Sequence, residues 1–331
     1  MPSKNYLPLI ISLGILFSFN MLMISSLSPG LLFKQFMSWM IGIGLFIAGQ
    51  QINPRQISSS KSMIFFLCCL FLLLPIFMNN ITRGSRRWLE LGFFSIQPSE
   101  FVKPWLMLFL VNTAAPLLIL VPFIITLVQP DLGSGLTILF LASPLVLYNP
   151  KFFKQVIILL FIGVLLSPLV WNSVLHDYQK DRISHFINPT TDPLGKGYNV
   201  IQSKIAIGSG GIWGKGYKKG TQGQLLFLPE KHTDFMFAST AEEMGLVGIT
   251  LIIGSYILLI KTLLSRAISA GNHPQLKIFT LGIVFQIWFT AFINIGMNLG
   301  VLPVTGIPLP FLSVGGSSLM ALMFSLGIIY S

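Results

Sequence analysis

The sequence consists of long apolar runs separated by short polar stretches, and this pattern constrains the fold more than any other feature. Several runs contain roughly 17 to 25 largely apolar residues, the length that an α-helix needs to cross a bilayer. Only 9% of the residues are charged, whereas soluble domains contain about 25%. The sequence therefore predicts an all-α polytopic membrane protein.

We expect about ten transmembrane helices, some of them short or broken, and one large extracytoplasmic loop at residues 172–235. Residues 97–129 leave only about 16 or 17 residues for each of two spans. Two short helices with a tight hairpin near Thr113 are expected here, and one long tilted helix is the alternative. Residues 1–331 are expected to form a single integral membrane domain. The other expected spans are residues 6–26, 32–50, 62–78, 134–148, 155–171, 236–261, 275–300 and 310–330.

The charges between the runs predict the orientation of the chain. One set of loops contains basic residues and no acid, and such loops face the cytoplasm. All ten acids then fall on the opposite side or at the outer ends of spans. We therefore expect any chemistry at the outer face. The basic residues of the inner loops are Lys4, Arg55, Lys61, Lys151, Lys154, Lys261, Arg266 and Lys277.

The net charge of +11 does not point to nucleic acid. The basic residues lie in short loops between spans and in one outer loop, and they form no basic stripe on a soluble domain. Membrane lipids, either anionic or phosphate-bearing, are the expected partners.

The segment 229–235, with the sequence PEKHTDF, places acids and bases at the entrance of a predicted span. An ionisable group at such a depth indicates a functional site. Asp234 is our candidate catalytic residue, because a partly desolvated carboxylate has a raised pKa and can accept a proton from a sugar hydroxyl. The alternative is that Asp234 caps the following helix.

Glu242 and Glu243 lie about two helical turns deeper than Asp234. A carboxylate that faces lipid is costly, so at least one of them should face the bundle interior or a polar cavity. Structural pairing with a buried base is the favoured interpretation.

Two further polar motifs flank the predicted hairpin at residues 97–129. Glu100 and Lys103 share one helix face at i, i+3 spacing and can form a local ion pair. Alternatively, Lys103 holds a pyrophosphate together with nearby arginines, namely Arg83, Arg86 and Arg87. Asp131 lies where Pro130 and Gly133 break an apolar run, so it either caps a helix or forms a wall of the site.

Other motifs exclude several classes of protein. The glycine-rich segment 208–216 does not match a P-loop or a dinucleotide fingerprint, and it is expected to need positive φ and close backbone approach. The four histidines have no zinc-ligand spacing, and no G-x-S-x-G motif is present. No metal site is predicted.

Taken together, the polar motifs resemble the SEDS family (shape, elongation, division and sporulation). The match extends in order over almost the whole chain, and residues 207–211 and 216–222 favour the RodA branch over the FtsW division branch. The chain departs from the family's pattern at two places. The link between the fourth and fifth helices is shorter, and Val314 stands where an aromatic residue is common. The matching segments are residues 87–89, 97–103, 129–133, 192–195, 201–216, 227–235, 241–245, 294–297, 302–310 and 315–318.

The resemblance implies a ten-helix glycosyltransferase of the bacterial cytoplasmic membrane that polymerises lipid II during cell elongation, with a class B penicillin-binding protein as partner. It makes Asp234 the essential residue. The residues expected to bind substrate are Arg87, Glu100, Lys103, Asp131, Lys231 and His232, and those expected to support them are Gln97, Glu242, Glu243, Ser317 and Ser318. The motifs identify no particular cofactor, and a divalent cation, Mg²⁺ or Mn²⁺, is an alternative means of stabilising the pyrophosphate.

The expected reaction is an inverting displacement, in which Asp234 deprotonates the acceptor hydroxyl while Arg87, Lys103 and Lys231 stabilise the departing pyrophosphate. Two alternatives remain: a transporter that flips a lipid-linked precursor, and a scaffold whose outer loop activates a partner enzyme. A transporter should need acids deep along a path through the bilayer, whereas here the acids collect at the outer face.

Overall fold

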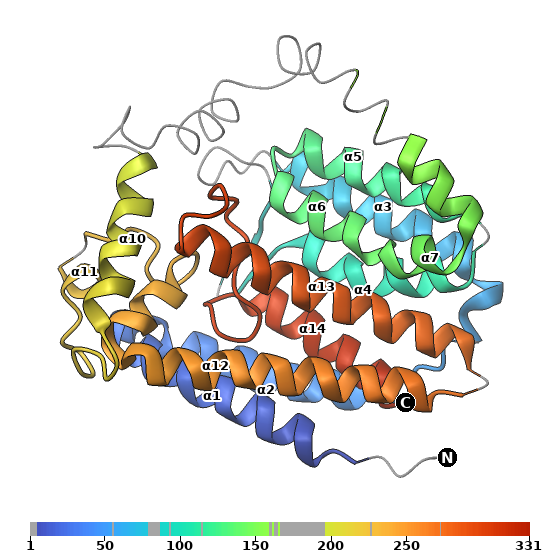
Figure 1. The fold of residues 1–331 in the computed structure, drawn as a ribbon. Coiled ribbons are helices and arrows are strands. Elements are labelled where there is room, and N and C mark those ends of the chain that lie inside the picture. Colours follow the sequence, from blue (N-terminus) through green and yellow to red (C-terminus); the bar gives the residue numbers. More distant parts are fainter. Residues whose placement is uncertain are drawn as a thin grey trace.

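The apolar runs fold into helices that lie side by side in a bundle (Figure 1). The computed structural model describes residues 5–54, 56–78, 87–92, 94–113, 115–158, 161, 165, 196–225, 227–271 and 273–331. Figure 1 shows the start of α1 and the end of α14 at one end of the bundle and helices α10 (Lys196–Gly210) and α11 (Thr221–Gln224) at the other.

The first two predicted spans are confirmed as helices joined by a short turn. α1 (Leu7–Leu27) leads through the 3-10 turn η1 (Pro29–Leu31) into α2 (Leu32–Gly49). α2 packs closely along α14 (Gly316–Ile329). At this contact a Cβ on Gly327 would lie 2.1 Å from the carbonyl oxygen of Phe46, so only glycine permits the approach.

The longest helix is α12 (Met236–Ser269), which packs against α1 and α13 (Pro274–Asn298). It bends at Gly245, where φ is 64° and ψ is −163°. A Cβ at this glycine would also lie 2.5 Å from the carbonyl oxygen of Ile212. Both the left-handed backbone and the close neighbour require glycine here.

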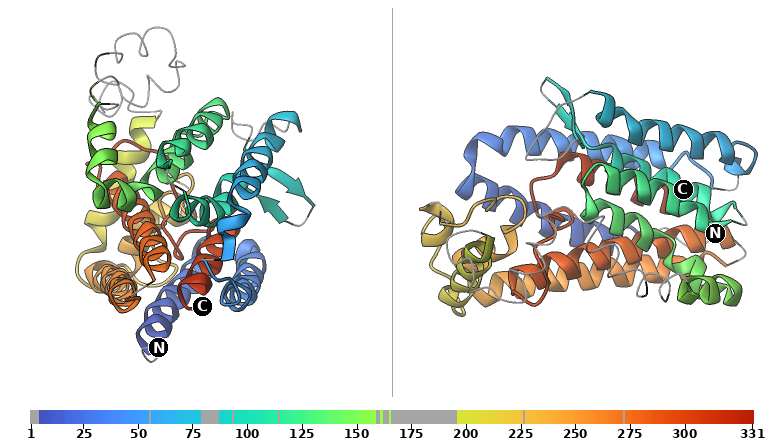
Figure 2. Two further views of the ribbon diagram at one scale, coloured as in Figure 1. Left: turned by 90° about the vertical axis from the view of Figure 1, so that its right-hand side faces the viewer. Right: turned by 90° about the horizontal axis from the view of Figure 1, so that it is seen from above.

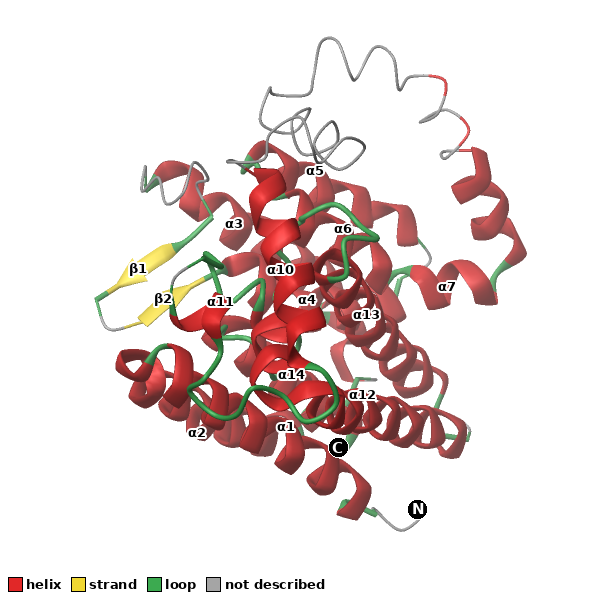
Figure 3. Ribbon diagram, turned by 60° about the vertical axis from the view of Figure 1, so that its left-hand side comes forward, coloured by secondary structure: helices red, strands yellow, loops and turns green. Residues whose placement is uncertain are grey.

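The other helices form a second group (Figure 2). Its members are α3 (Lys61–Phe77), preceded by the turn η2 (Gln56–Ser59), α4 (Pro98–Val111), η3 (Pro116–Ile119), α5 (Leu120–Val128), α6 (Leu132–Leu141) and α7 (Ser143–Tyr148). α4 is almost wholly buried and contacts α3, α6, α13 and α14, so it joins this group to the first. Before α4, β1 (Leu89–Leu91) and β2 (Phe94–Ile96) pair as a small antiparallel hairpin (Figure 3).

Several expectations are confirmed. Among the described helices, four are long and apolar enough to span a bilayer, and four shorter apolar segments accompany them. Residues 97–129 form two short helical segments, and the first of them, α4, ends just before Asn112 and Thr113. The glycine-rich segment has positive φ at Gly211, Gly214 and Gly216. The total of ten spans stays a prediction.

Other boundaries differ from expectation. α14 begins at Gly316, six residues later than predicted, because proline and glycine hold residues 303–315 outside a helix. The predicted span 134–148 is divided near Ala142, just before Pro144. α10 forms a 15-residue helix within the predicted loop. Most of the predicted span 155–171, and the loop residues 172–195, lie outside the described residues.

Candidate active site

A polar cavity of about 130 Å³ lies where the N-terminal ends of four helices meet: α4, α6, α12 and α14. Helix N-termini carry unpaired N–H groups and a positive partial charge, so they favour anions. The residues that line the cavity are Arg87, Trp88, Gln97, Glu100, Ser134, Thr137, Thr233, Asp234, Gly306, Ile307, Pro308, Val314, Gly315, Ser317 and Ser318.

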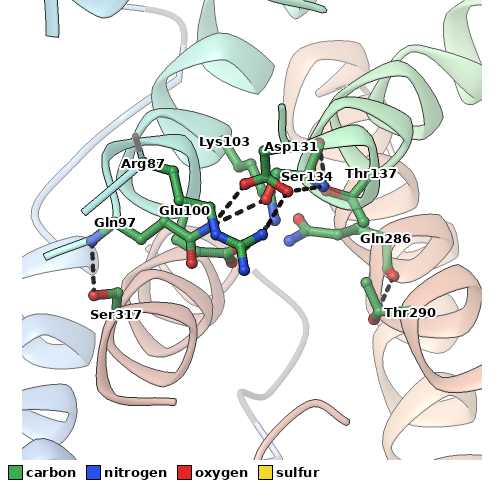
Figure 4. A network of polar contacts seen from close by, with 10 residues as sticks. All are labelled: Arg87, Gln97, Glu100, Lys103, Asp131, Ser134, Thr137, Gln286, Thr290 and Ser317. Atoms are coloured by element: carbon green, nitrogen blue, oxygen red, sulfur yellow. Dashed lines mark hydrogen bonds and ion pairs between the residues drawn. The ribbon is translucent and has the colours of Figure 1, made fainter. Parts of the chain in front are cut away.

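Asp131 organises one wall of this cavity (Figure 4). Its Oδ1 accepts hydrogen bonds from the N–H of Ser134 (3.2 Å) and from Nη1 of Arg87 (3.0 Å), and its Oδ2 accepts one from Nε2 of Gln97 (2.9 Å). Asp131 therefore caps α6 and also holds Arg87 against the cavity. The helix-capping interpretation is confirmed, whereas Asp131 itself does not line the cavity and contacts it only through the residues that it binds.

Glu100 and Lys103 form the ion pair that their spacing predicts, with 2.5 Å between Nζ and Oε1. Both residues are buried, and only Glu100 lines the cavity. Lys103 lies behind Glu100 and offsets its negative charge. The structure thus gives Lys103 no direct exposure to a substrate, contrary to the expected pyrophosphate contact, because burial is tolerable for this lysine only beside its carboxylate.

Asp234 is half-buried in the turn that precedes α12, and it lines the cavity. Its carbonyl oxygen accepts hydrogen bonds from the Nδ2 atoms of Asn294 (3.1 Å) and Asn298 (3.0 Å) on α13. Its Oδ2 faces Gly306, where an added Cβ would lie 3.7 Å away. The N-cap of α12 is Phe235 rather than Asp234, which favours the catalytic interpretation over the capping one.

The start of α14 closes the cavity opposite α6. Ser317 accepts a hydrogen bond from the backbone N–H of Gln97 (3.1 Å) and donates one to the carbonyl of Ser95 (3.2 Å). It therefore fixes α14 to the β-hairpin and to the start of α4. Ser318 lines the cavity beside it.

A second cavity of about 370 Å³ adjoins the first, and the two share Arg87, Trp88, Thr233, Val314 and Gly315. His232 lines this second cavity and not the first. Its carbonyl accepts a hydrogen bond from the N–H of Val314 at 2.9 Å. His232 thus lies at the site but in the second cavity, whereas Asp234 lines the first.

Lys231 lines neither of these two cavities. Its Nζ donates to the carbonyl of Gly223 at 2.7 Å. Burial lowers the pKa of Lys231, and the charge of Glu243 partly opposes this shift. The expected contact between Lys231 and pyrophosphate is therefore not supported, because its ammonium group bonds to Gly223. Gly223 belongs to the segment 196–224, which packs on α12 through α10 and α11 and is called the outer segment below.

Glu242 and Glu243 are fully buried and hold that outer segment in place. Glu242 accepts hydrogen bonds from the N–H groups of Thr221 (2.8 Å) and Gln222 (3.0 Å) and from Nζ of Lys215 (2.7 Å). Glu243 accepts hydrogen bonds from Ser26 Oγ, Gln224 Nε2 and the N–H of Lys218. The predicted structural pairing with a base is confirmed for Glu242, and neither carboxylate lines the cavity.

Sequence reasoning missed several residues of the site. Lys34, Gln35 and Ser38 of α2 line the second cavity, and Gln35 is buried with an Nε2 that donates to no described acceptor. Their signal was three polar residues within one apolar run. Asn294 and Asn298 recur one helical turn apart on α13, which could have indicated a shared polar face. Arg83 and Arg86 lie outside the described residues.

Comparison with known proteins identifies the family. The model of the FtsW, RodA and SpoVE family, described as cell cycle proteins, matches residues 4–331. The chain is 38% identical over 312 residues to the peptidoglycan glycosyltransferase MrdB of Escherichia coli K12, covering 88% of this chain and 82% of the relative. It is 37% identical over 290 residues to the stage V sporulation protein E of Bacillus subtilis, covering 81% of this chain and 77% of that protein.

Two solved structures are also similar. The first, described as "Structural coordination of polymerization and crosslinking by a peptidoglycan synthase complex", has a TM-score of 0.83 and 31% identity, covering 100% of this chain and 98% of that chain. The second is a mutant of the rod shape determining protein RodA of Thermus thermophilus, with a TM-score of 0.69 and 25% identity, covering 99% and 97%.

The fold and site therefore define an integral membrane protein of the bacterial inner membrane with a polar cavity at one end of its helices. The chain belongs to the FtsW, RodA and SpoVE family.

Proposed function

We propose that the protein is a peptidoglycan glycosyltransferase that joins lipid II units into glycan strands at the outer face of the membrane during cell elongation. The observation that carries this proposal is the position of Asp234 and Arg87 in one cavity, at the N-terminal ends of four helices. The names of the relatives support the same reaction class.

The proposed reaction is a displacement at an anomeric carbon. The hydroxyl oxygen of the acceptor sugar attacks this carbon, Asp234 takes the hydroxyl proton, and the bond to the pyrophosphate oxygen breaks. Arg87 and the helix N-termini stabilise the charge that develops on the pyrophosphate. Because pyrophosphate is already a good leaving group, one carboxylate near the reacting atoms suffices.

Arg87 suits this role because Asp131 orients it without removing all of its donors. Its Nη1 bonds to Asp131, while its Nε makes no hydrogen bond with the described residues. A guanidinium presents several donors in a fixed plane that matches phosphate oxygens. Glu100 is already neutralised by Lys103, so it repels the incoming pyrophosphate less than an unpaired carboxylate would.

Two substrates must meet at the site, and the two adjoining cavities offer neighbouring positions for their reacting groups. The shared wall at Arg87 and Thr233 lies between Asp234 on one side and Gln35 and His232 on the other. We place the reacting groups at this wall and assign Gln35 to binding a polar group of one sugar or peptide. The class B penicillin-binding protein that would cross-link the product is the proposed partner.

The described residues do not form a ligand set for a divalent cation. No three His, Cys, Asp or Glu side chains gather among them, and Asp131 and Glu100 are each bound by a cation of the chain. No step of the proposed reaction is assigned to a metal ion.

The test is polymerisation of lipid II by the purified protein, with and without a cognate penicillin-binding partner, in three forms: wild type, Asp234→Asn and Glu230→Gln. Asp234→Asn should reduce the rate by about 10²- to 10⁴-fold, the usual contribution of a general base. Glu230→Gln makes the same chemical change outside both cavities and should retain most of the activity.

Equal synthesis by the wild type and Asp234→Asn would remove Asp234 from the chemistry. Absence of synthesis under every condition, together with movement of lipid II across vesicle membranes, would identify a transporter instead.

A further inference from the structure

A further pocket with charged residues is separate from the two cavities of the candidate active site. The ends of the helices that form it lie at the other end of the bundle from α10 and α11 (Figure 1). The pocket has a volume of about 350 Å³ and is formed by the start of α1, the last three turns of α12 and Tyr330 beside the end of α14. Its charged residues are Lys261 and Arg266, and its hydroxyl groups include those of Thr262 and Ser265.

The guanidinium of Arg266 is held in a defined position. Its Nε donates to the carbonyl of Ile329 at 3.4 Å, and its Cζ lies 5.3 Å from the ring centroid of Tyr330. The ring stacks in turn on Tyr6 of α1. These contacts orient the arginine while its terminal nitrogens make no ion pair with any described residue.

The pocket has no carboxylate to balance its charge. Residues 1–89 and 244–331, which supply every residue that lines this pocket, contain no Asp or Glu at all. At the candidate active site, by contrast, the basic residues have acidic partners, since Arg87 and Lys103 each form an ion pair with a carboxylate of the chain. Two cations and several hydroxyls without a counter-ion define a site for an external anion.

The surroundings of the pocket point to a lipid rather than a dissolved anion. Leu7, Ile257 and Ile268 are more than half exposed on the same two helices, and both helices are long and apolar enough to span a bilayer. Leu258 lines the pocket itself. An anion held here lies at the level of phospholipid headgroups, beside a surface that acyl chains can cover.

We propose that this pocket binds the phosphate of an anionic phospholipid in the leaflet at the acid-free end of the bundle. Lys261 and Arg266 bind the phosphate oxygens, Ser265 donates a hydrogen bond, and the acyl chains lie along the apolar face of α12. The proposal depends on the membrane insertion of the protein and is independent of the glycosyltransferase activity.

The test measures retention of phosphatidylglycerol by the whole protein, using native mass spectrometry after exchange from vesicles of phosphatidylcholine and phosphatidylglycerol. The double variant Lys261→Gln/Arg266→Gln should retain this lipid on the order of tenfold less than the wild type. Lys151→Gln/Lys154→Gln removes the same charge from two exposed lysines of another helical stretch and should bind as the wild type does.

Two further variants distinguish the loss of positive charge from misfolding of the protein. Lys261 is exposed, so Lys261→Gln alone should fold normally and weaken retention several-fold. Lys261→Arg/Arg266→Lys keeps both charges and should retain the lipid. Equal retention by all variants would overturn the proposal, and so would displacement of the lipid by inorganic phosphate at equal concentration, because either result removes the specific lipid site.

Discussion

Two carboxylate groups near the N-terminal end of α12, Asp234 and Glu242, lie eight residues apart in the sequence and have different surroundings. Asp234 is half-buried beside a cavity, in a turn that α13 holds through its backbone carbonyl. Glu242 is 0% exposed, and its oxygens accept hydrogen bonds from residues 215–223. The first carboxylate is positioned next to space that a substrate can enter, whereas the second is enclosed by donors of its own chain.

This difference separates a catalytic role from a structural one more clearly than sequence position does. Both groups belong to the matching motifs, and both lie at the predicted membrane boundary. If the distinction is correct, changes at Asp234 should alter the reaction rate and leave the fold intact. Changes around Glu242 should instead lower the stability of the fold and alter the reaction rate of the folded protein less.

Among variants that keep a carboxylate or a charge at the site, the largest effect is expected from Asp234→Glu, which retains the base but moves it by one methylene group. A displacement of about 1 Å at a reacting group can cost about 10²-fold in rate, so we expect a loss of that size in lipid II polymerisation. The thermal unfolding midpoint in detergent should stay at the wild-type value. Wild-type rates would show that the position of the carboxylate is not critical.

Gly210→Ala should destabilise the outer segment by about 2 kcal/mol or more. The added Cβ would lie 2.0 Å from the carbonyl oxygen of Ala241, so backbone must shift. Gly208→Ala on the same helix is the matched control, because nothing lies within 4 Å of its Cβ. Thermal unfolding of both variants measures the effect, and equal midpoints would contradict this contact.

Glu242→Gln should reduce the free energy of unfolding by about 1 to 3 kcal/mol, because an amide accepts fewer hydrogen bonds and leaves Lys215 without its partner. Trypsin should then cleave faster at Lys218 and Lys219 of the released segment. Polymerisation per folded molecule should change less than in Asp234→Glu. A rate loss larger than in that variant would give Glu242 a role in the reaction.

The smallest effect is expected from Arg87→Lys, which keeps the charge but loses the planar set of donors. We expect about a tenfold loss in rate, since one charge-assisted hydrogen bond to phosphate contributes about 1.4 kcal/mol or more. Arg87→Lys can still pair with Asp131, so the unfolding midpoint should be nearly unchanged. The measurement is the initial polymerisation rate at saturating lipid II.

The sequence predicted the elements whose determinants are local. Apolar length gave the helices α1, α2 and α13, and the polar residues near Thr113 gave the turn between α4 and η3. Prediction was less accurate where proline, glycine and tertiary contacts compete. α10 lies in a polar segment and is stabilised by packing on α12. It could therefore not be predicted from an apolar run.

The sequence predicted many residues of the site, but it did not predict which of their side chains line the cavity. Spacing placed Glu100 and Lys103 on one face, yet it could not tell which of them reaches the cavity. Lys231 adjoins the catalytic motif in sequence and bonds to Gly223 in space. Gln35 comes from a helix far from every other motif residue along the chain, so only the packing of α2 against the start of α14 shows its place.

The acid-free end of the bundle also responds to the electrical state of the cell. With this end inside, an inside-negative membrane potential favours its basic residues by about 2.3 kcal/mol per charge at 100 mV. For Lys261, Arg266 and Lys277 together, inversion of the chain would be opposed by about 7 kcal/mol at that voltage. In the proposed orientation, the polarity of the energised membrane therefore helps to keep Asp234 on the outer side.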